Sequence, residues 1–194
     1  MRNQFSKAAA VCALAFVCLL SVAGAQTPGA PATPLNTVVQ KPTYTSINLE
    51  ITVNRPAAEV WKRVGKFCDI GEWLRIQCTI TAGKDGEFGA VRSVANEVLV
   101  GKTELSYTYT QPVRADRVYN LYHGTVEARP LTATTSKLVY TLVFDNSMLP
   151  DDAAREKDKA QRTAQFTQAL ENMKILAEGG TLPPAPPRGA QPGR

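Results

Sequence analysis

Apolar and polar residues alternate at the start of the region that we expect to fold. Between Tyr44 and Val53, the apolar residues Ile47, Leu49 and Ile51 are separated by polar ones. Successive side chains of a strand point to opposite faces of a sheet, so this period of two predicts a half-buried strand. One face of the first element is therefore expected to lie in the core.

A helical spacing follows this strand. Pro56, whose fixed backbone angle suits the first turn of a helix, precedes apolar residues that recur every three to four positions. Asp69 is placed to cap a second short helix, which carries Trp73. The apolar positions of the first helix are Val60, Trp61, Val64 and Phe67.

After Ile76 the pattern returns to strands. Short apolar runs are separated by turn residues such as Gly83 and Pro112. Their spacing is typical of successive hairpins, which predicts an antiparallel sheet. The predicted strands are residues 78–80, 90–95, 97–100, 105–110, 118–128 and 137–144.

The last predicted element is a long helix over residues 151–178. Asp151 is a good N-cap, and Gly179 follows the last helical residue. The first half of the helix is strongly polar, whereas the second half places apolar residues on one face, so we expect mainly the second half to be buried. These apolar residues are Phe166, Leu170, Met173 and Ala177.

The order of the elements predicts an α+β fold class. A strand, two short helices, six further strands and a long helix leave the sheet with one face for the long helix to cover. We therefore expect a curved seven-stranded antiparallel sheet wrapped on the C-terminal helix, with space between the two.

Composition changes the picture at both ends of the chain. Residues 1–25 have a basic start, an apolar stretch too short to span a bilayer and small residues before a cleavage point after Ala25, which predicts a signal peptide. The protein is thus expected to be exported, periplasmic or secreted, without a stable membrane anchor. Residues 26–43 and the Pro-rich residues 179–194 are predicted to be disordered, which leaves 44–178 as the domain.

Charge and cysteine content narrow the function classes. Removing residues 1–25 lowers the formal net charge from +5 to +3, which is too mild to indicate nucleic-acid binding. Cys68 and Cys78 then remain, and an even pair in an oxidising compartment predicts a disulfide. The alternative is a metal or redox pair, but the single histidine, His123, cannot complete a usual zinc set. We predict neither a metal nor a cofactor.

Several short motifs, in order and spacing, resemble the helix-grip superfamily, which includes START lipid-transfer domains. The similarity is greatest to the bacterial polyketide cyclase/dehydrase-like group, and it covers about residues 44–178. Relatives often have Trp-His-Pro where this chain has Trp73-Leu74-Arg75. The motifs are residues 56–61 (PAAEVW), 67–70 (FCDI) with Trp73 and Cys78, 89–92 (GAVR), Glu97, 106–109 (SYTY), and Tyr122 before 124–126 (GTV).

The resemblance implies a cavity lined by aromatic side chains with a few polar ones to orient a ligand. It places Tyr107, Tyr109 and Tyr122 towards the cavity, and Arg92 and Glu97 at positions that often face inward. His123 follows Tyr122 and so points to the other face, which argues against a catalytic role. The expected ligand-binding residues are Trp73, Arg92, Glu97, Tyr107, Tyr109, Tyr122 and Tyr140, and no catalytic residue is predicted.

The function expected from these features is binding of a hydrophobic or amphipathic, lipid- or polyketide-like small molecule. One alternative is a cyclase/dehydrase-type enzyme in which Glu97 or a tyrosine moves protons in the same cavity. Another is a module without a ligand, whose cavity is filled by its own side chains. The sequence leaves the ligand and the oligomeric state open.

Overall fold

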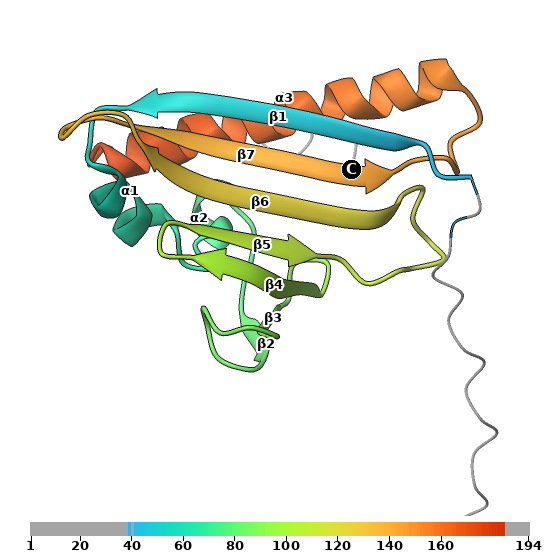
Figure 1. Cartoon of the computed structure of the whole chain (residues 1–194), viewed down its shortest axis with the longest axis horizontal. Helices are drawn as coiled ribbons and strands as arrows, with labels where there is room; N and C mark the ends of the chain where they lie inside the picture. Colours follow the sequence, from blue (N-terminus) through green and yellow to red (C-terminus); the bar gives the residue numbers. More distant parts are fainter. Residues whose placement is uncertain (1–38, 40, 185–194) are drawn as a thin grey trace, which may run out of the picture. The chain divides into compact units, whose positions relative to one another are not determined.

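The computed structural model describes residues 39 and 41–184 (Figure 1). The predictions for 1–25, for most of 26–43 and for the end of the Pro-rich tail lie outside these residues. The helices are α1 (Ala57–Val64), α2 (Ile70–Trp73) and α3 (Asp152–Ala177). The strands are β1 (Tyr44–Val53), β2 (Ile80–Ala82), β3 (Val91–Arg92), β4 (Glu97–Thr103), β5 (Ser106–Thr110), β6 (Asn120–Pro130) and β7 (Ser136–Asp145).

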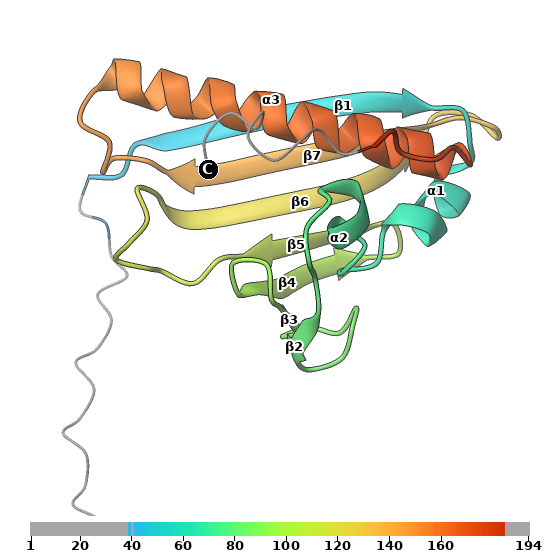
Figure 2. The same cartoon turned by 180° about the vertical axis from the view of Figure 1, so that it is seen from behind.

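The strands form one seven-stranded sheet in the order β1-β7-β6-β5-β4-β3-β2, and every neighbouring pair is antiparallel (Figure 1). All three helices lie on one side of the sheet, with α3 along β1 and β7 and the two short helices beside its C-terminal half (Figure 2). The predicted α+β arrangement, a curved sheet wrapped on a long helix with two short helices after the first strand, is confirmed.

The alternation in β1 works as the sequence predicts. Ile47 and Val53 are buried beneath α3, whereas Asn48 and Glu50 between them are exposed on the other face. β7, which pairs with β1 along its whole length, shows the same period. Its buried apolar residues are Leu138, Tyr140, Leu142 and Phe144.

The second predicted strand is shifted by two residues, and the third is shorter than expected. Residues 78–80 give β2 at Ile80–Ala82, and residues 90–95 give only Val91–Arg92. Ala95 and Asn96 have positive φ angles of 51° and 54°, so the chain turns back at this point to start β4. The tight reversal shortens β3 and places Arg92 directly opposite Glu97.

The ends of the helices follow simple rules of backbone capping. Asp151 caps α3, since its side chain accepts a hydrogen bond from the Ala154 N–H, and Gly179 follows the helix with a φ of 88°. As predicted, Phe166 and Met173 in the second half are buried. Pro56 is the N-cap of α1 rather than a residue of its first turn.

The predicted disulfide between Cys68 and Cys78 is present, with the two Cα atoms 5.6 Å apart. The bond closes the loop of residues 68–78, which contains α2 and ends just before β2. Trp73, the last residue of α2, is fully buried against the sheet, and its ring meets the Tyr140 ring edge-on at 6.1 Å. The disulfide therefore links the segment that bears Trp73 to the residues just before β2, an edge strand of the sheet.

Candidate functional site

The structure brings the seven predicted site residues together in the interior between the sheet and the helices. They come from α2, β3, β4, β5, β6 and β7, and each is 3% exposed or less. The six strand residues share an orientation because side chains alternate along each strand, and Trp73 faces the same interior from α2. They are Trp73, Arg92, Glu97, Tyr107, Tyr109, Tyr122 and Tyr140.

A buried ion pair lies at the centre of this group. The Arg92 Nε donates to Glu97 Oε2 at 2.6 Å, and Nη2 lies 2.5 Å from the same oxygen. Arg92 also donates through Nη1 to the backbone oxygen of Phe67. Because removing two charges from water is unfavourable, a buried pair of this kind depends on every remaining polar contact.

Aromatic rings enclose the Arg92 guanidinium. Its central carbon lies 4.2 Å from the centre of the Phe67 ring and 4.6 Å from that of Tyr109. Burial opposes the charge on Arg92, but the oxygens of Tyr107 and Glu97 favour it, and the net effect raises the pKa of Arg92. The cation is therefore retained in the core by ring faces and oxygens.

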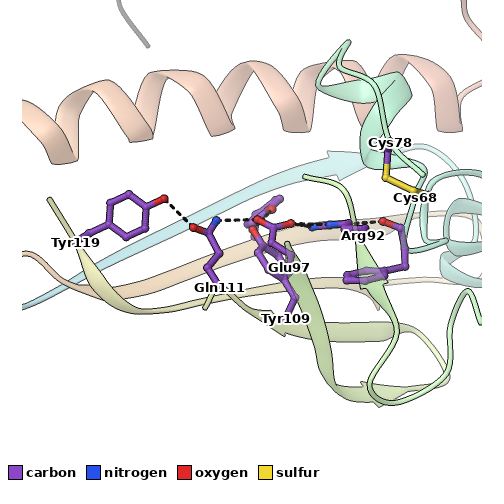
Figure 3. A network of polar contacts seen from close by, with 9 residues as sticks. Cys68, Cys78, Arg92, Glu97, Tyr109, Gln111 and Tyr119 are labelled. Atoms are coloured by element: carbon purple, nitrogen blue, oxygen red, sulfur yellow. Dashed lines mark hydrogen bonds and ion pairs between the residues drawn. A yellow bond between two sulfur atoms is a disulfide. The ribbon is translucent and has the colours of Figure 1, made fainter. Parts of the chain in front are cut away.

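Glu97 connects the ion pair to the outer part of the site. Its second oxygen, Oε1, accepts a hydrogen bond from the Gln111 side chain at 2.8 Å, and Gln111 in turn accepts one from the Tyr119 hydroxyl at 2.7 Å (Figure 3). Burial raises the pKa of Glu97 above its ordinary value, although Arg92 and Gln111 act in the opposite direction. A continuous polar chain thus runs from Tyr119 through Gln111 and Glu97 to Arg92.

Tyr109 and Tyr140 are joined by a hydrogen bond of 2.8 Å between their hydroxyls, although β6 lies between their strands. Tyr109 reaches across because Gly124, directly opposite on β6, has no side chain. A Cβ at this glycine would lie 2.3 Å from the Tyr109 ring. Burial raises the pKa of both tyrosines well above the ordinary value, so they act as neutral hydroxyls.

Among residues 41–184, three buried polar groups of the site make no hydrogen bond of good geometry, and one of them, Arg92 Nη2, is paired ionically with Glu97. The other two are the Trp73 Nε1–H and the Tyr107 hydroxyl, which lies beside the Arg92 guanidinium. Buried polar groups are nearly always hydrogen-bonded, so these two are exceptions in the packed interior.

Arg162 is a residue of this interior that the sequence analysis missed. It lies in the polar half of α3, and its guanidinium carbon is 4.5 Å from the centre of the Tyr119 ring and 4.6 Å from that of Phe144. The spacing offered a signal, because position 162 precedes Phe166 by four residues and therefore shares its inward face. Gln111 and Tyr119 gave no such signal. Gln111 lies in the irregular segment after β5, and alternation within the predicted strand 118–128 places Tyr119 on the face opposite to Tyr122.

A surface hollow of about 510 Å³ opens onto the aromatic part of the site. Trp61, Phe67, Leu99 and Tyr107 supply its apolar lining. Its charged lining residues are Lys66, Asp85, Lys102 and Glu104. Tyr107 therefore belongs both to the buried group and to this hollow.

A second hollow, of about 360 Å³, lies beside the C-terminal end of α3. Its polar lining includes Arg63, Glu72 and Arg75, and Arg63 forms a two-pronged ion pair with Glu72. None of the seven predicted site residues lines it. It is therefore separate from the interior group.

The single histidine of the chain lies outside the interior group. His123 is exposed, on the opposite face of β6 from buried Tyr122, as predicted. Across the described part of the chain, no group of three or more histidine, cysteine, aspartate and glutamate side chains is arranged to hold a metal ion. None of the helices in residues 41–184 is long and apolar enough to cross a membrane.

A sheet that wraps on a long C-terminal helix, with a polar and aromatic group enclosed between them, defines the helix-grip class of proteins. Residues 44–178 match the family model described as polyketide cyclase / dehydrase and lipid transport, so this chain belongs to that family. A search among curated protein sequences found no match.

Solved structures with the same fold include proteins of different activities. An aromatase/cyclase from a Streptomyces species is 20% identical, with a TM-score of 0.54 over 72% of this chain and 100% of that one. A Thermobifida fusca protein is 22% identical, with a TM-score of 0.53 over 70% and 95% of the two chains. A norcoclaurine synthase from Thalictrum flavum is 13% identical, with a TM-score of 0.50 over 74% and 100%. At these identities the likeness concerns the fold.

Proposed function

We propose that this protein binds a hydrophobic or amphipathic small molecule between the sheet and the helices. The observation that carries the proposal is Tyr107, which lines the 510 Å³ hollow and also contacts the buried group around Arg92. The hollow offers a ligand the aromatic rings of Trp61, Phe67 and Tyr107, and the Tyr107 hydroxyl lies beside the Arg92 guanidinium. Membership of a family described by cyclase, dehydrase and lipid-transport activities supports a ligand of this kind.

The driving force for such a ligand is burial of apolar area, at about 25 cal/mol per Å². Trp61, Phe67 and Leu99 provide the apolar surface of the hollow. A ligand oxygen that accepts a hydrogen bond from Tyr107 or Trp73 would satisfy a group that the folded chain leaves open. Oriented binding of a carbonyl-bearing or hydroxyl-bearing apolar molecule follows from this combination.

The direct test is a binding titration with a neutral fluorescent probe, N-phenyl-naphthylamine, together with mass spectrometry of the natively purified protein. Glu104 lines the hollow and is exposed, so Glu104→Trp places an indole in the hollow without disturbing the core. We expect this variant to bind the probe about tenfold more weakly, equivalent to about 1.4 kcal/mol.

The matched control is Glu156→Trp, which removes the same charge and adds the same indole on the exposed side of α3. The control should bind the probe like the unchanged protein. If the unchanged protein binds no probe and carries no co-purifying compound, the ligand proposal is wrong. The remaining reading is then a module without a ligand, for which the mutual contacts of Tyr109 and Tyr140 would be simple core packing.

An enzyme of the cyclase/dehydrase type is a second candidate because burial raises the pKa of Glu97, a direction that suits a carboxyl used in proton transfer. Both oxygens of Glu97 are occupied by Arg92 and Gln111, however, so a substrate would have to displace one of them. Turnover of a polyketide-like substrate that is lost in Glu97→Gln would favour this candidate over simple binding.

We further propose that the protein acts outside the cytoplasm after cleavage following Ala25. The disulfide between Cys68 and Cys78 supports an oxidising compartment. Cell fractionation with N-terminal sequencing tests this proposal. An extracytoplasmic protein that begins at Gln26 is the expected result, and an uncleaved cytoplasmic protein would contradict it.

A further inference from the structure

The polar half of α3 places one arginine over aromatic rings of the interior. Arg162 has a side chain that is 16% exposed, and its guanidinium carbon lies over the rings of Tyr119, Phe144 and Tyr122 at 4.5, 4.6 and 5.8 Å. These rings come from the loop before β6, from β7 and from β6. Three aromatic rings, one from a loop and two from strands, thus face one guanidinium.

One edge of this guanidinium is already occupied. The Nε of Arg162 donates to both carboxylate oxygens of Asp158, at 3.1 and 2.9 Å. Asp158 lies four residues earlier on the same helix, and its side chain is 18% exposed. Because the pair is formed within α3, the orientation of the guanidinium does not depend on any ligand.

The other edge is open. Within the described part of the chain, no protein acceptor bonds to Nη1 or Nη2 of Arg162, which together carry four N–H groups. Arg92, the other arginine of the interior, differs in this respect, since Glu97 and the Phe67 carbonyl occupy it. The terminal nitrogens of an arginine form a planar fork that matches a carboxylate or sulfonate.

We propose that Arg162 is the anion-binding residue of the site and that the ligand is an amphipathic acid: a compact carboxylate or sulfonate joined to an apolar, preferably aromatic, body. The proposal rests on the proposed function, because the body of the ligand is to be held in the same interior. The anion lies on the Nη edge of Arg162. Asp158 is a positioning residue that holds the Nε edge.

Two probes that differ in one group test this assignment. Anilinonaphthalene sulfonate and N-phenyl-naphthylamine share their ring system, and the first carries an additional sulfonate. Fluorescence titrations of both probes are compared for the unchanged protein and for Arg162→Gln. Ionic hydrogen bonds contribute about 1.5–3 kcal/mol, so the variant should bind the sulfonate about ten- to a hundredfold more weakly. Its binding of the neutral probe should change by less than about twofold, since no charge contacts that probe.

The matched control is Arg155→Gln, which removes the same charge from the same half of α3. Arg155 pairs with Asp152 and the Leu149 carbonyl instead of facing the three rings. Its affinity for the sulfonate probe should stay near that of the unchanged protein. If Arg162→Gln fails to fold, Arg162→Lys keeps a cation beside Asp158 but loses the planar fork. The lysine variant should then bind the sulfonate probe more weakly and the neutral probe as the unchanged protein does.

Different outcomes separate the two proposals. Suppose that the neutral probe binds but the affinity for the sulfonate probe is unchanged in Arg162→Gln, or falls equally in Arg155→Gln. The anion assignment is then overturned, while the binding function stands. A loss that is equal for both probes also overturns it, since Arg162 would then act by packing. If neither probe binds, the proposed function and this inference both fail.

Discussion

Gly124 and Tyr109 form the tightest steric relation in the site. A Cβ on Gly124 would lie 2.3 Å from Cζ of Tyr109, so a methyl group at this position must displace the ring. We expect Gly124→Ala to lower the free energy of unfolding by about 1–3 kcal/mol, as overpacked cores generally do. Urea unfolding measures the effect.

The control for this prediction is a double-mutant cycle. In a Tyr109→Ala background the space opposite Gly124 is free, so adding Gly124→Ala there should be neutral or slightly stabilising. Equal destabilisation in both backgrounds would show that the ring is not the cause.

Glu97 gives a prediction about pH. Its pKa in the folded protein is raised above the ordinary value of 4.5, mainly by burial. A raised folded pKa means that the contribution of Glu97 to stability is fully present below about pH 4.5 and is lost as the pH rises through the folded pKa. The free energy of unfolding of the unchanged protein, relative to that of Glu97→Gln, should therefore decrease as the pH rises above 4.5.

Unfolding by urea at a series of pH values measures this slope. A difference that instead grows in favour of the unchanged protein with rising pH would mean that the contacts to Arg92 and Gln111 outweigh burial. In that case the folded pKa of Glu97 lies below its ordinary value.

At the scale of elements, the disulfide is the device that holds α2. Reduction of the bond between Cys68 and Cys78, or replacement of both residues by serine, should lower the free energy of unfolding by about 2.5–3 kcal/mol, the value for a loop of this length. Urea unfolding with and without reductant measures this loss. The serine variant should be insensitive to reductant.

A thiol count under denaturing, non-reducing conditions supplies the control. The unchanged protein should show the same number of free thiols as the Cys68→Ser/Cys78→Ser variant. Two additional thiols in the unchanged protein would rule out the bond.

The sequence predicted long, regular elements better than short ones. β1 has the expected bounds, because ten residues of strict alternation leave no competing pattern. β3 was predicted too long, because the chain already turns at Ala95, whose residue type does not favour the positive φ angle that it adopts. The extent of a short strand depends on the turn that ends it, and that turn is fixed by contacts elsewhere in the fold.

At the scale of the whole molecule, the end of α3 holds the end of β1. The Lys174 Nζ donates to the Thr52 carbonyl at 2.7 Å, and the Asn54 N–H donates to Glu178 at 2.8 Å. Replacing Lys174 and Glu178 together by alanine should cost about 1–3 kcal/mol of stability. Amide hydrogen exchange near Thr52 should become faster, because the carboxyl end of β1 opens more easily.

The matched control is Glu156→Ala with Lys157→Ala. This pair removes the same two charges from exposed positions of α3. The control should leave exchange in β1 unchanged. Faster exchange in both double variants would mean that helix charge, rather than the contacts to β1, governs the opening.

Some residues of the site could be predicted from the sequence. Alternation within strands and the family resemblance placed Tyr107 and Tyr109 inward, and the structure agrees. The partners of these residues could not be foreseen, because the Tyr109–Tyr140 bond spans an intervening strand and depends on Gly124. Arg162 was missed because the polar composition around it concealed its shared face with Phe166.

The order of strands in the sheet has a consequence for how the chain reaches its structure. Of the seven strands in residues 41–184, β1 is synthesised first, yet its neighbour in the sheet is β7, which is synthesised last. Thr43 and Asp145, which are joined by a hydrogen bond, lie 102 positions apart. β1 must therefore wait for its partner through the synthesis of nearly the whole domain, which is typical of slowly folding topologies. Until β7 is synthesised, the apolar face of β1 is uncovered. A chaperone that binds this face would compete with β7.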